Sequence, residues 1–229
     1  MAMYADTVVI SVGGSLIVPD GIDTAFLKKF REVIEKHVRA GMRFLIIAGG
    51  GATARNYQAF AKQSGDLSPE DLDWLGIHAT RLNGHLLLSL FRKHAHPVLI
   101  TNPGKLTSTK KPIFIAAGWR PGRSTDYVAA ILAKKIGATK LVNLSDIDYV
   151  YSEDPKKSKR AKPLTDISWK EFRAMLPPKW DPGIHTPFDP IASREAEWAK
   201  IEVAVIHGNN LKEFENYLSG KKFIGTKIS

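Results

Sequence analysis

The chain has 229 residues, of which 44% are hydrophobic and 24% are charged, and this balance excludes a fibrous protein or one disordered throughout. Its 33 lysines and arginines exceed its 23 acidic residues, and the formal net charge of +10 suits phosphorylated ligands but equally suits solubility alone. The absence of cysteine excludes disulfides and thiolate metal sites, and no apolar run is long enough to span a bilayer, so we expect a cytoplasmic protein without a membrane partner.

The first predicted elements are two buried strands joined by a helix. β-Branched and apolar residues run almost without interruption over Thr7–Val12, which predicts a strand buried on both faces. Apolar side chains recur at helical spacing over Thr24–Arg39, and Gly41 follows as a helix stop before a second apolar run at 43–48. A helix that crosses over between two such strands is typical of a parallel sheet, so we expect an α/β fold.

The same alternation continues to about residue 150. Helices are predicted at 52–63, 75–93 and 124–135, and strands at 97–100, 112–117 and 140–144. On the helix at 75–93, Leu82, Leu86 and Leu90 fall in register as one apolar face. These elements extend the predicted parallel sheet.

The pattern changes beyond residue 150. A basic stretch precedes a short helix at 168–176, and five prolines in fourteen residues predict an irregular loop at 177–190. A helix at 191–200, a strand at 201–206, a helix from Asn210 and a strand near 222–228 complete the predicted elements. Because no repeat or disordered linker interrupts the chain, we expect one domain over residues 1–229 whose two halves share one sheet.

Three glycine-containing turns each follow a predicted strand, at 13–15, 49–51 and 118–126. Parallel strands end at the same edge of a sheet, so we expect the three turns to converge there. Glycine leaves backbone N–H groups open to a bound group, and a helix start favours anions, here with Arg55 in the first turns of the following helix. The turns therefore indicate an anion site, although an ordinary surface turn remains the alternative for 118–126.

Two common phosphate motifs fit this chain poorly. Residues 49–54 match the loose dinucleotide pattern G-x-G-x-x-A, but no strand ends in an acidic residue about 20 positions later. The Walker A pattern is missing, because "GWRPGRST" has one residue too few and carries Arg123 where lysine belongs. An acidic segment at 143–155 is by itself typical of a solvated turn, but beside phosphate-binding glycines it can position Mg²⁺ or hold a ribose hydroxyl.

Five motifs in this order resemble the amino acid kinase superfamily, and within it the archaeal-like uridine monophosphate kinases: "SVGGSL", "AGGGATAR", "DWLGIHATRLNG", "RPGRSTD" and "SDIDYVYSEDP". The resemblance implies a three-layer α/β/α sandwich with an open, mainly parallel sheet, an acceptor-binding half at about 1–140 and an ATP-binding half at about 141–229. It also implies transfer of the γ-phosphoryl group of ATP to UMP with Mg²⁺, in a homohexamer built as a trimer of dimers. The alternatives are a kinase of another small acceptor, such as isopentenyl phosphate or a carboxylate, and a non-catalytic anion-storage protein.

The resemblance further implies the residues of the site. On the ATP side these are Gly13, Gly14, Ser15, Gly51, Arg55, Ser145, Asp148, Tyr151 and Asp154. On the UMP side they are Gly50, Asp73, Trp119, Arg120, Pro121, Gly122, Arg123, Ser124 and Thr125. Arg55 and Arg123 would supply catalytic charge, and Asp126 would orient nearby cations rather than act as a base.

Some positions depart from the family pattern. Ser11 stands where many members carry lysine, so the missing cation is expected from Arg55, Arg123 or a lysine of 156–162. Tyr149 replaces a usual glycine, and Trp119 and Arg120 make the acceptor loop bulkier. Histidines at 78, 85, 94 and 96 lack H-E-x-x-H spacing, so no protein metal site is assigned. The basic residues occur in loops without a recognised motif, so no nucleic-acid partner is expected.

Overall fold

The structure, a computed structural model, describes residues 6–107, 109–177 and 186–229. Within these residues a seven-stranded sheet has the order β3-β2-β1-β4-β8-β9-β7, and a separate two-stranded ribbon is formed by β5 and β6. The strands are β1 (Thr7–Val12), β2 (Arg43–Ala48), β3 (Ile113–Ala116), β4 (Lys140–Ser145), β5 (Val150–Tyr151), β6 (Pro163–Leu164), β7 (Asp166–Ile167), β8 (Glu202–His207) and β9 (Thr226–Ile228). Every pairing in the large sheet is parallel except that of β8 with β9.

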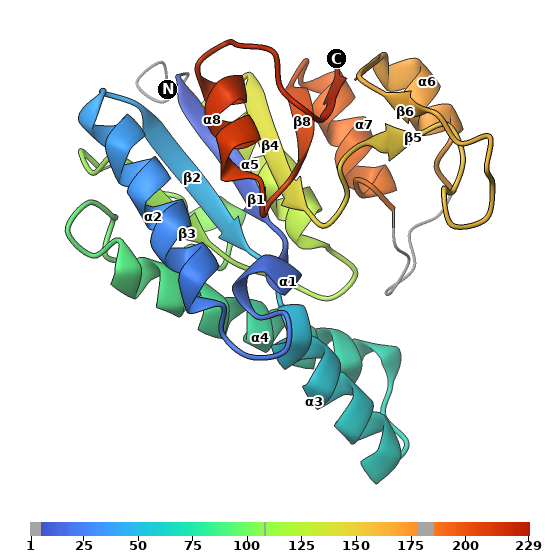
Figure 1. Cartoon of the computed structure of the whole chain (residues 1–229). Coiled ribbons are helices and arrows are strands. Elements are labelled where there is room, and N and C mark those ends of the chain that lie inside the picture. The colour runs from blue at the N-terminus through green and yellow to red at the C-terminus, as the bar shows by residue number, and fades with distance from the viewer. Residues whose placement is uncertain (1–5, 108, 178–185) are drawn as a thin grey trace.

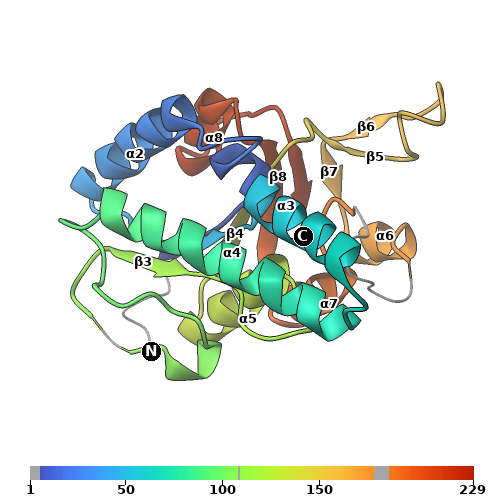
Figure 2. The same cartoon turned by 90° about the horizontal axis from the view of Figure 1, so that it is seen from below.

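Helices cover both faces of this sheet, which makes a three-layer sandwich (Figures 1 and 2). Three helices lie on one face: α2 (Thr24–Arg39), α8 (Leu211–Leu218) and α4 (Pro69–Leu90). The helix α4 packs against β2 and β3. On the other face lie α5 (Thr125–Ile136), α6 (Trp169–Ala174) and α7 (Pro190–Trp198). The short α1 (Gly14–Ile17) follows β1, and α3 (Gly51–Ser64) follows β2. The expected three-layer α/β/α fold with a mainly parallel sheet is confirmed.

Alternating side chains of the strands enter two separate cores. On β1, Ile10 packs into the core beneath α2 and α8, whereas Val9 packs into the core beneath α5 and α7. Phe30 of α2 lies at the centre of the first core, with its ring 6.2 Å from that of Phe91 and 6.5 Å from that of Phe214. Burial on both faces explains why the strands are near-continuous apolar runs.

The helix α4 differs most from its sequence prediction. It begins at Pro69 rather than near residue 75, because Ser68 and Asp71 form a capping box and proline suits the first helical turn. The predicted apolar face is right for Leu86 and Leu90, which pack against the first core, and wrong for Leu82, which is 64% exposed. The buried positions of the helix also include the polar Thr80 and Asn83. The predicted strand at 97–100 is also absent from this described segment, where Ile100 forms only an isolated bridge with Ala116.

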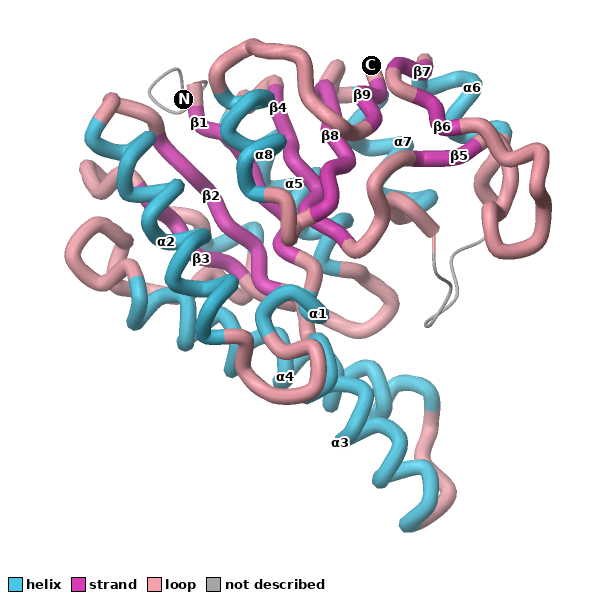
Figure 3. The backbone as a smooth tube through the Cα atoms, viewed as in Figure 1, coloured by secondary structure: helices cyan, strands magenta, loops and turns pink. Residues whose placement is uncertain are grey.

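The paired helices α3 and α4 extend well beyond the body of the sandwich (Figure 3). Large apolar side chains are exposed on this projection, including Tyr57, Phe60 and Trp74. The predicted loop at 177–190 lies largely outside the described residues. No helix in the described part of the chain is long and apolar enough to cross a membrane.

Candidate active site

The parallel strands bring the glycine-containing turns to one edge of the sheet. Val12, the last residue of β1, pairs with Ala48 at the end of β2 and with Leu144 near the end of β4. The arrowheads of these strands point to the same edge in Figure 1, where α1 and α3 begin. The chain leaves β1 toward β2 and later returns to β4 on the other side, so this edge contains the topological switch point at which α/β sheets bind ligands.

The first two glycine turns are packed backbone against backbone. A Cβ atom on Gly14 would lie 1.9 Å from the nitrogen of Gly51 and 2.6 Å from that of Gly50, which no side chain tolerates. Gly51 has a φ of +62°, and its own Cβ would lie 2.3 Å from the oxygen of Gly14. Glycine is therefore required at both positions for lack of space, and at Gly51 also for its backbone conformation. The contact places the starts of α1 and α3 side by side.

One face of α4 connects these turns to the third one. The buried side-chain amide of Asn83 donates hydrogen bonds to the carbonyl oxygens of Gly49 at 2.8 Å and Gly50 at 3.0 Å. One helical turn earlier, the hydroxyl of Thr80 accepts a hydrogen bond from the N–H of Gly118 at 2.8 Å. A Cβ on Gly50 would also lie 3.7 Å from the methyl carbon of Thr80. The three turns predicted to converge do meet, and α4 joins them.

The loop from Gly118 to Thr125 contains the predicted acceptor residues. Asp73 of α4 accepts a hydrogen bond from the N–H of Gly122 at 2.7 Å, and Gly122 has a φ of +72°. Arg120 stacks 4.2 Å from the ring centroid of Trp119, which itself packs against the second core. The other predicted members continue this loop into α5, where Ser124 is the N-cap. The predicted acceptor residues 119–125 thus form one loop, and Asp73 of α4 is hydrogen-bonded to its backbone.

Arg123 and Arg55 carry charge at different places. Arg123 is partly buried and lies 4.7 Å from the ring centroid of Tyr127, in the first turn of α5. Arg55 is exposed on α3, and its guanidinium donates to the carbonyl oxygen of Pro19 at 2.9 Å. Arg55 is thereby held beside the segment that leaves α1, whereas Arg123 lies at the third turn.

Asp126 is a partly buried acid on the floor of the site. Its carboxylate accepts a hydrogen bond from the Ser11 hydroxyl at 2.8 Å. Burial raises the pKa of Asp126 to about 6; the Ser11 hydrogen bond opposes this rise, and the negative charge of Asp189 adds to it. Within the described residues no lysine or arginine lies within 4.0 Å of the Asp126 carboxylate, so the group it orients directly is the hydroxyl that replaces the family's lysine.

A cavity of about 710 Å³ opens between the ends of β1 and β4. Its floor includes Ser11 and Asp126, and its walls come from the segment after β4, from α6 and from Thr186 and Pro187. Of the predicted ATP-side residues, the lining includes Gly13, Ser145, Tyr151 and Asp154. Asp148 is exposed and does not line the cavity, whereas Lys156 of the basic run does. The other four predicted members do not line the cavity: Gly14 and Ser15 are in α1, and Gly51 and Arg55 are in α3.

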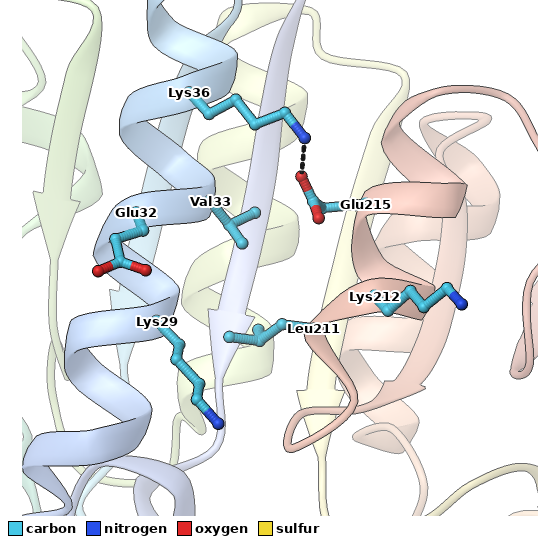
Figure 4. Close-up of a pocket in the computed structure, with 7 residues that line it drawn as sticks. All are labelled: Lys29, Glu32, Val33, Lys36, Leu211, Lys212 and Glu215. Atoms are coloured by element: carbon cyan, nitrogen blue, oxygen red, sulfur yellow. Dashed lines mark hydrogen bonds and ion pairs between the residues drawn. The ribbon is translucent and has the colours of Figure 1, made fainter.

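A second, shallower groove of about 340 Å³ lies between α2 and α8 (Figure 4). Lys36 of α2 and Glu215 of α8 form an ion pair across it at 2.6 Å, and Val33 and Leu211 form part of its floor. The groove contains none of the predicted site residues and none of the glycine turns. The cavity at the strand ends is therefore the candidate active site.

The amino acid kinase family model matches residues 6–207. The chain belongs to the amino acid kinase family. Among its relatives, uridylate kinase of Methanocorpusculum labreanum is 34% identical over 231 residues, covering 96% of this chain and 94% of that protein. Uridylate kinase of Methanospirillum hungatei is 32% identical over 226 residues, covering 97% and 94%. The crystal structure of uridylate kinase from Archaeoglobus fulgidus matches with a TM-score of 0.82 at 29% identity, covering 97% of this chain and 99% of that one.

The sequence analysis did not predict three residues that hold the parts of the site together. Thr80 and Asn83 occur in the motif "ATRLNG", and their spacing of three on a helix with buried apolar neighbours is the signal that could have found them. Asn143 on β4 donates to the carbonyl oxygen of Pro187 at 2.9 Å and so fixes one wall of the cavity. That contact joins residues far apart in sequence, and no local pattern predicts it.

Proposed function

We propose that this protein is a UMP kinase, which transfers the γ-phosphoryl group of ATP to UMP and releases UDP and ADP. Its family and the two uridylate kinases that align along more than nine tenths of both chains support this reaction. In the structure, the observation that carries the proposal is the meeting of three glycine-containing turns on α4 at one edge of the sheet.

The ATP side of the proposed site is the cavity between β1 and β4. Tyr151, Phe172 and Ile147 line it with aromatic and apolar surface suited to a purine ring. No side chain caps the starts of α1 and α3, so the N–H groups there that have no backbone partner can donate to phosphates. We therefore place the ATP phosphates at Gly13–Ser15 and Gly51, with the base toward Tyr151 and Asp154.

The UMP side is the adjoining surface formed by Gly50, Asp73 and the loop 119–125. Asp73 is partly buried and offers a carboxylate to a ribose hydroxyl, while Arg123 brings positive charge toward the acceptor phosphate. The phosphate of UMP is ionised at neutral pH, so the attacking oxygen needs no strong base. What the chain must supply is alignment of two anionic nucleotides and neutralisation of their charge.

Mg²⁺ bound with ATP would supply part of that neutralisation. The described residues contain no group of three or more acidic or histidine side chains that could hold a metal ion. Magnesium usually keeps several waters and takes only one or two carboxylates beside nucleotide phosphates, and the partly buried Asp126 on the cavity floor fits that need. The Ser11 hydroxyl and the backbone N–H of Asp189 would keep this carboxylate oriented toward the phosphates.

We also propose that the chain assembles as a homo-oligomer through the α3–α4 projection. Phe60 is 72% exposed and Tyr57 is 64% exposed, and their spacing of three on α3 places them on one helix face. Exposed apolar clusters of this kind are typical of protein interfaces. The hexamer implied by the resemblance, the cytoplasmic location and the lack of a nucleic-acid partner stay predictions.

A coupled ADP-release assay on the full chain tests the reaction. The panel should contain UMP, CMP, AMP and GMP, isopentenyl phosphate, small carboxylates and a blank without acceptor, each with MgATP. We expect turnover with UMP well above the blank and formation of UDP by chromatography. Turnover with another acceptor while UMP stays inert would contradict the proposed substrate, and ATP binding without any turnover would point to a storage protein.

A further inference from the structure

Arg81 of α4 reaches from the helix to the backbone of the acceptor loop. Its Nε donates to the carbonyl oxygen of Gly118 at 3.2 Å, and its Nη2 donates to the carbonyl oxygen of Trp119 at 2.9 Å. The side chain is partly buried between the helix and the loop. One rigid, planar guanidinium thus holds two consecutive carbonyl groups, a geometry that a lysine ammonium does not reproduce.

Other side chains of α4 complete this attachment. Thr80 accepts from the N–H of Gly118, and Asp73 accepts from the N–H of Gly122. Arg81 is the partner that donates, so the helix satisfies both the N–H and the C=O groups at the start of the loop. The guanidinium also lies 5.7 Å from the ring centroid of Trp74, about two turns earlier on the same face of α4, and this contact limits its movement.

We propose that Arg81 is a positioning residue that fixes the acceptor loop 118–125 in its binding conformation, an inference that rests on the proposed function. Arg81 contacts the carbonyl oxygens of the loop, and its effect on substrate passes through that backbone. Gly122 and Gly118 give the loop considerable freedom, and without Arg81 that freedom must be lost when the acceptor binds. The cost then falls on acceptor binding and leaves the ATP side unchanged.

The test combines hydrogen exchange with steady-state kinetics on the full-length protein. The variants are Arg81→Met, which keeps the stem and removes the fork, and Arg81→Lys, which keeps the charge. Arg39→Met, at the exposed end of α2, is the matched control for loss of one arginine. Exchange is followed in peptides covering 117–124 and, as an internal reference, in peptides of β8 (Glu202–His207).

In Arg81→Met we expect exchange in 117–124 to be about tenfold faster and KM for UMP to rise about tenfold, while KM for ATP and kcat stay within about twofold of the parent. For Arg81→Lys we expect an exchange rate and a KM for UMP between those of Arg81→Met and the parent. Arg39→Met should match the parent in both. Unchanged exchange in 117–124 overturns the inference whatever the acceptor is. Faster exchange with equal changes in both KM values also overturns it, because that pattern marks general loosening.

The two proposals fail in different ways. If the parent protein is inert toward UMP, the proposed function fails, and the kinetic arm uses the acceptor that the assay panel identifies. If no acceptor is found, the exchange result in Arg81→Met and Arg81→Lys alone decides whether Arg81 fixes the loop. Should Arg81→Met fail to fold, Arg81→Lys still removes one of the two carbonyl contacts and answers the same question.

Discussion

Ser11 on β1 donates a hydrogen bond to Asp126 at the start of α5, across 115 positions of sequence, at 2.8 Å. The pair joins the first strand to the helix that follows the acceptor loop, and both residues line the candidate active site. Because the hydroxyl is neutral where the family's lysine would be charged, burial is not offset by a direct positive charge. The carboxylate therefore holds its proton to higher pH than an exposed aspartate.

The first prediction concerns stability as a function of pH. The pKa of Asp126 is raised from 3.8 to about 6, so between these values the folded protein binds the proton more tightly than the unfolded chain. Relative to Asp126→Asn, the free energy of unfolding of the parent should fall as pH rises from about 4 to about 6, by up to about 3 kcal/mol. Urea denaturation at pH 4, 5, 6 and 7 measures it, with the exposed Asp20→Asn as control. A difference between parent and Asp126→Asn that is constant with pH would contradict this prediction.

The second prediction concerns the packed glycine turns. Gly14→Ala places a methyl group 1.9 Å from the backbone nitrogen of Gly51, and the backbone must move to make room. We expect a loss of about 1–3 kcal/mol in the free energy of unfolding together with loss of phosphoryl transfer. Gly21→Ala is the control, because a Cβ there meets nothing within 4 Å. Equal stability of the two variants, measured by thermal or chemical denaturation, would show that the turns are not in contact.

The third prediction concerns Asn83, which is 3% exposed and binds two carbonyl oxygens of the second turn. Asn83→Ala leaves those buried acceptors without their donor, so the free energy of unfolding should fall by about 1–3 kcal/mol. Asn83→Asp should cost more at neutral pH than at pH 4, because an ionised carboxylate would face the two oxygens. The exposed Asn209→Ala serves as control, and an Asn83→Ala variant as stable as that control would speak against this role.

The sequence predicts β1 and α2 well and the buried face of α4, which contains Asn83, less well. Strand β1 at Thr7–Val12 and helix α2 at Thr24–Arg39 match their predicted bounds, because periodicity and local end signals agree there. On α4 they disagree: the apolar pattern favours a face containing Leu82, but the helix buries polar Thr80 and Asn83 to hold the turns. The demands of the site override the hydrophobic pattern at this helix.

The candidate site could be predicted as a set of converging turns but not as a network. Parallel topology alone places the turns at one edge, so their meeting follows from the predicted strands. The pairing of Ser11 with Asp126 and that of Asn143 with Pro187 join distant segments, and the packing that creates them has no local sequence signal. The short strands β5, β6 and β7 were missed because two residues carry no periodicity.

The fourth prediction concerns positive charge at the acceptor loop. Arg123→Met removes a partly buried guanidinium next to the start of α5. The variant should lose about 2–4 kcal/mol of transition-state stabilisation, which is measured as a lower kcat/KM for UMP. Arg120→Met removes an exposed guanidinium three residues earlier and should cost less. Comparison of kcat/KM for the two variants measures the difference. If Arg120→Met proves the more damaging, the assignment of the catalytic cation to Arg123 is wrong.

The fifth prediction concerns assembly. Phe60→Glu places a charge on the exposed apolar face of α3 and should dissociate the oligomer, because an unpaired charge in an apolar interface is costly. Sedimentation or light scattering gives the molecular mass of parent and variant. Val98→Glu, at another exposed apolar position, should leave the mass unchanged. A parent protein that is already a monomer would contradict the proposed interface.

A crystal structure with UMP and a non-hydrolysable ATP analogue tests the central proposal most directly. We predict the ATP phosphates against Gly13–Ser15 and Gly51, the base in the cavity beside Tyr151, and UMP against Gly50, Asp73 and the loop 119–125. The two reacting phosphates should face each other across the contact between Gly14 and Gly50. Density for either nucleotide in the groove between α2 and α8, with the strand-end cavity empty, would contradict the account.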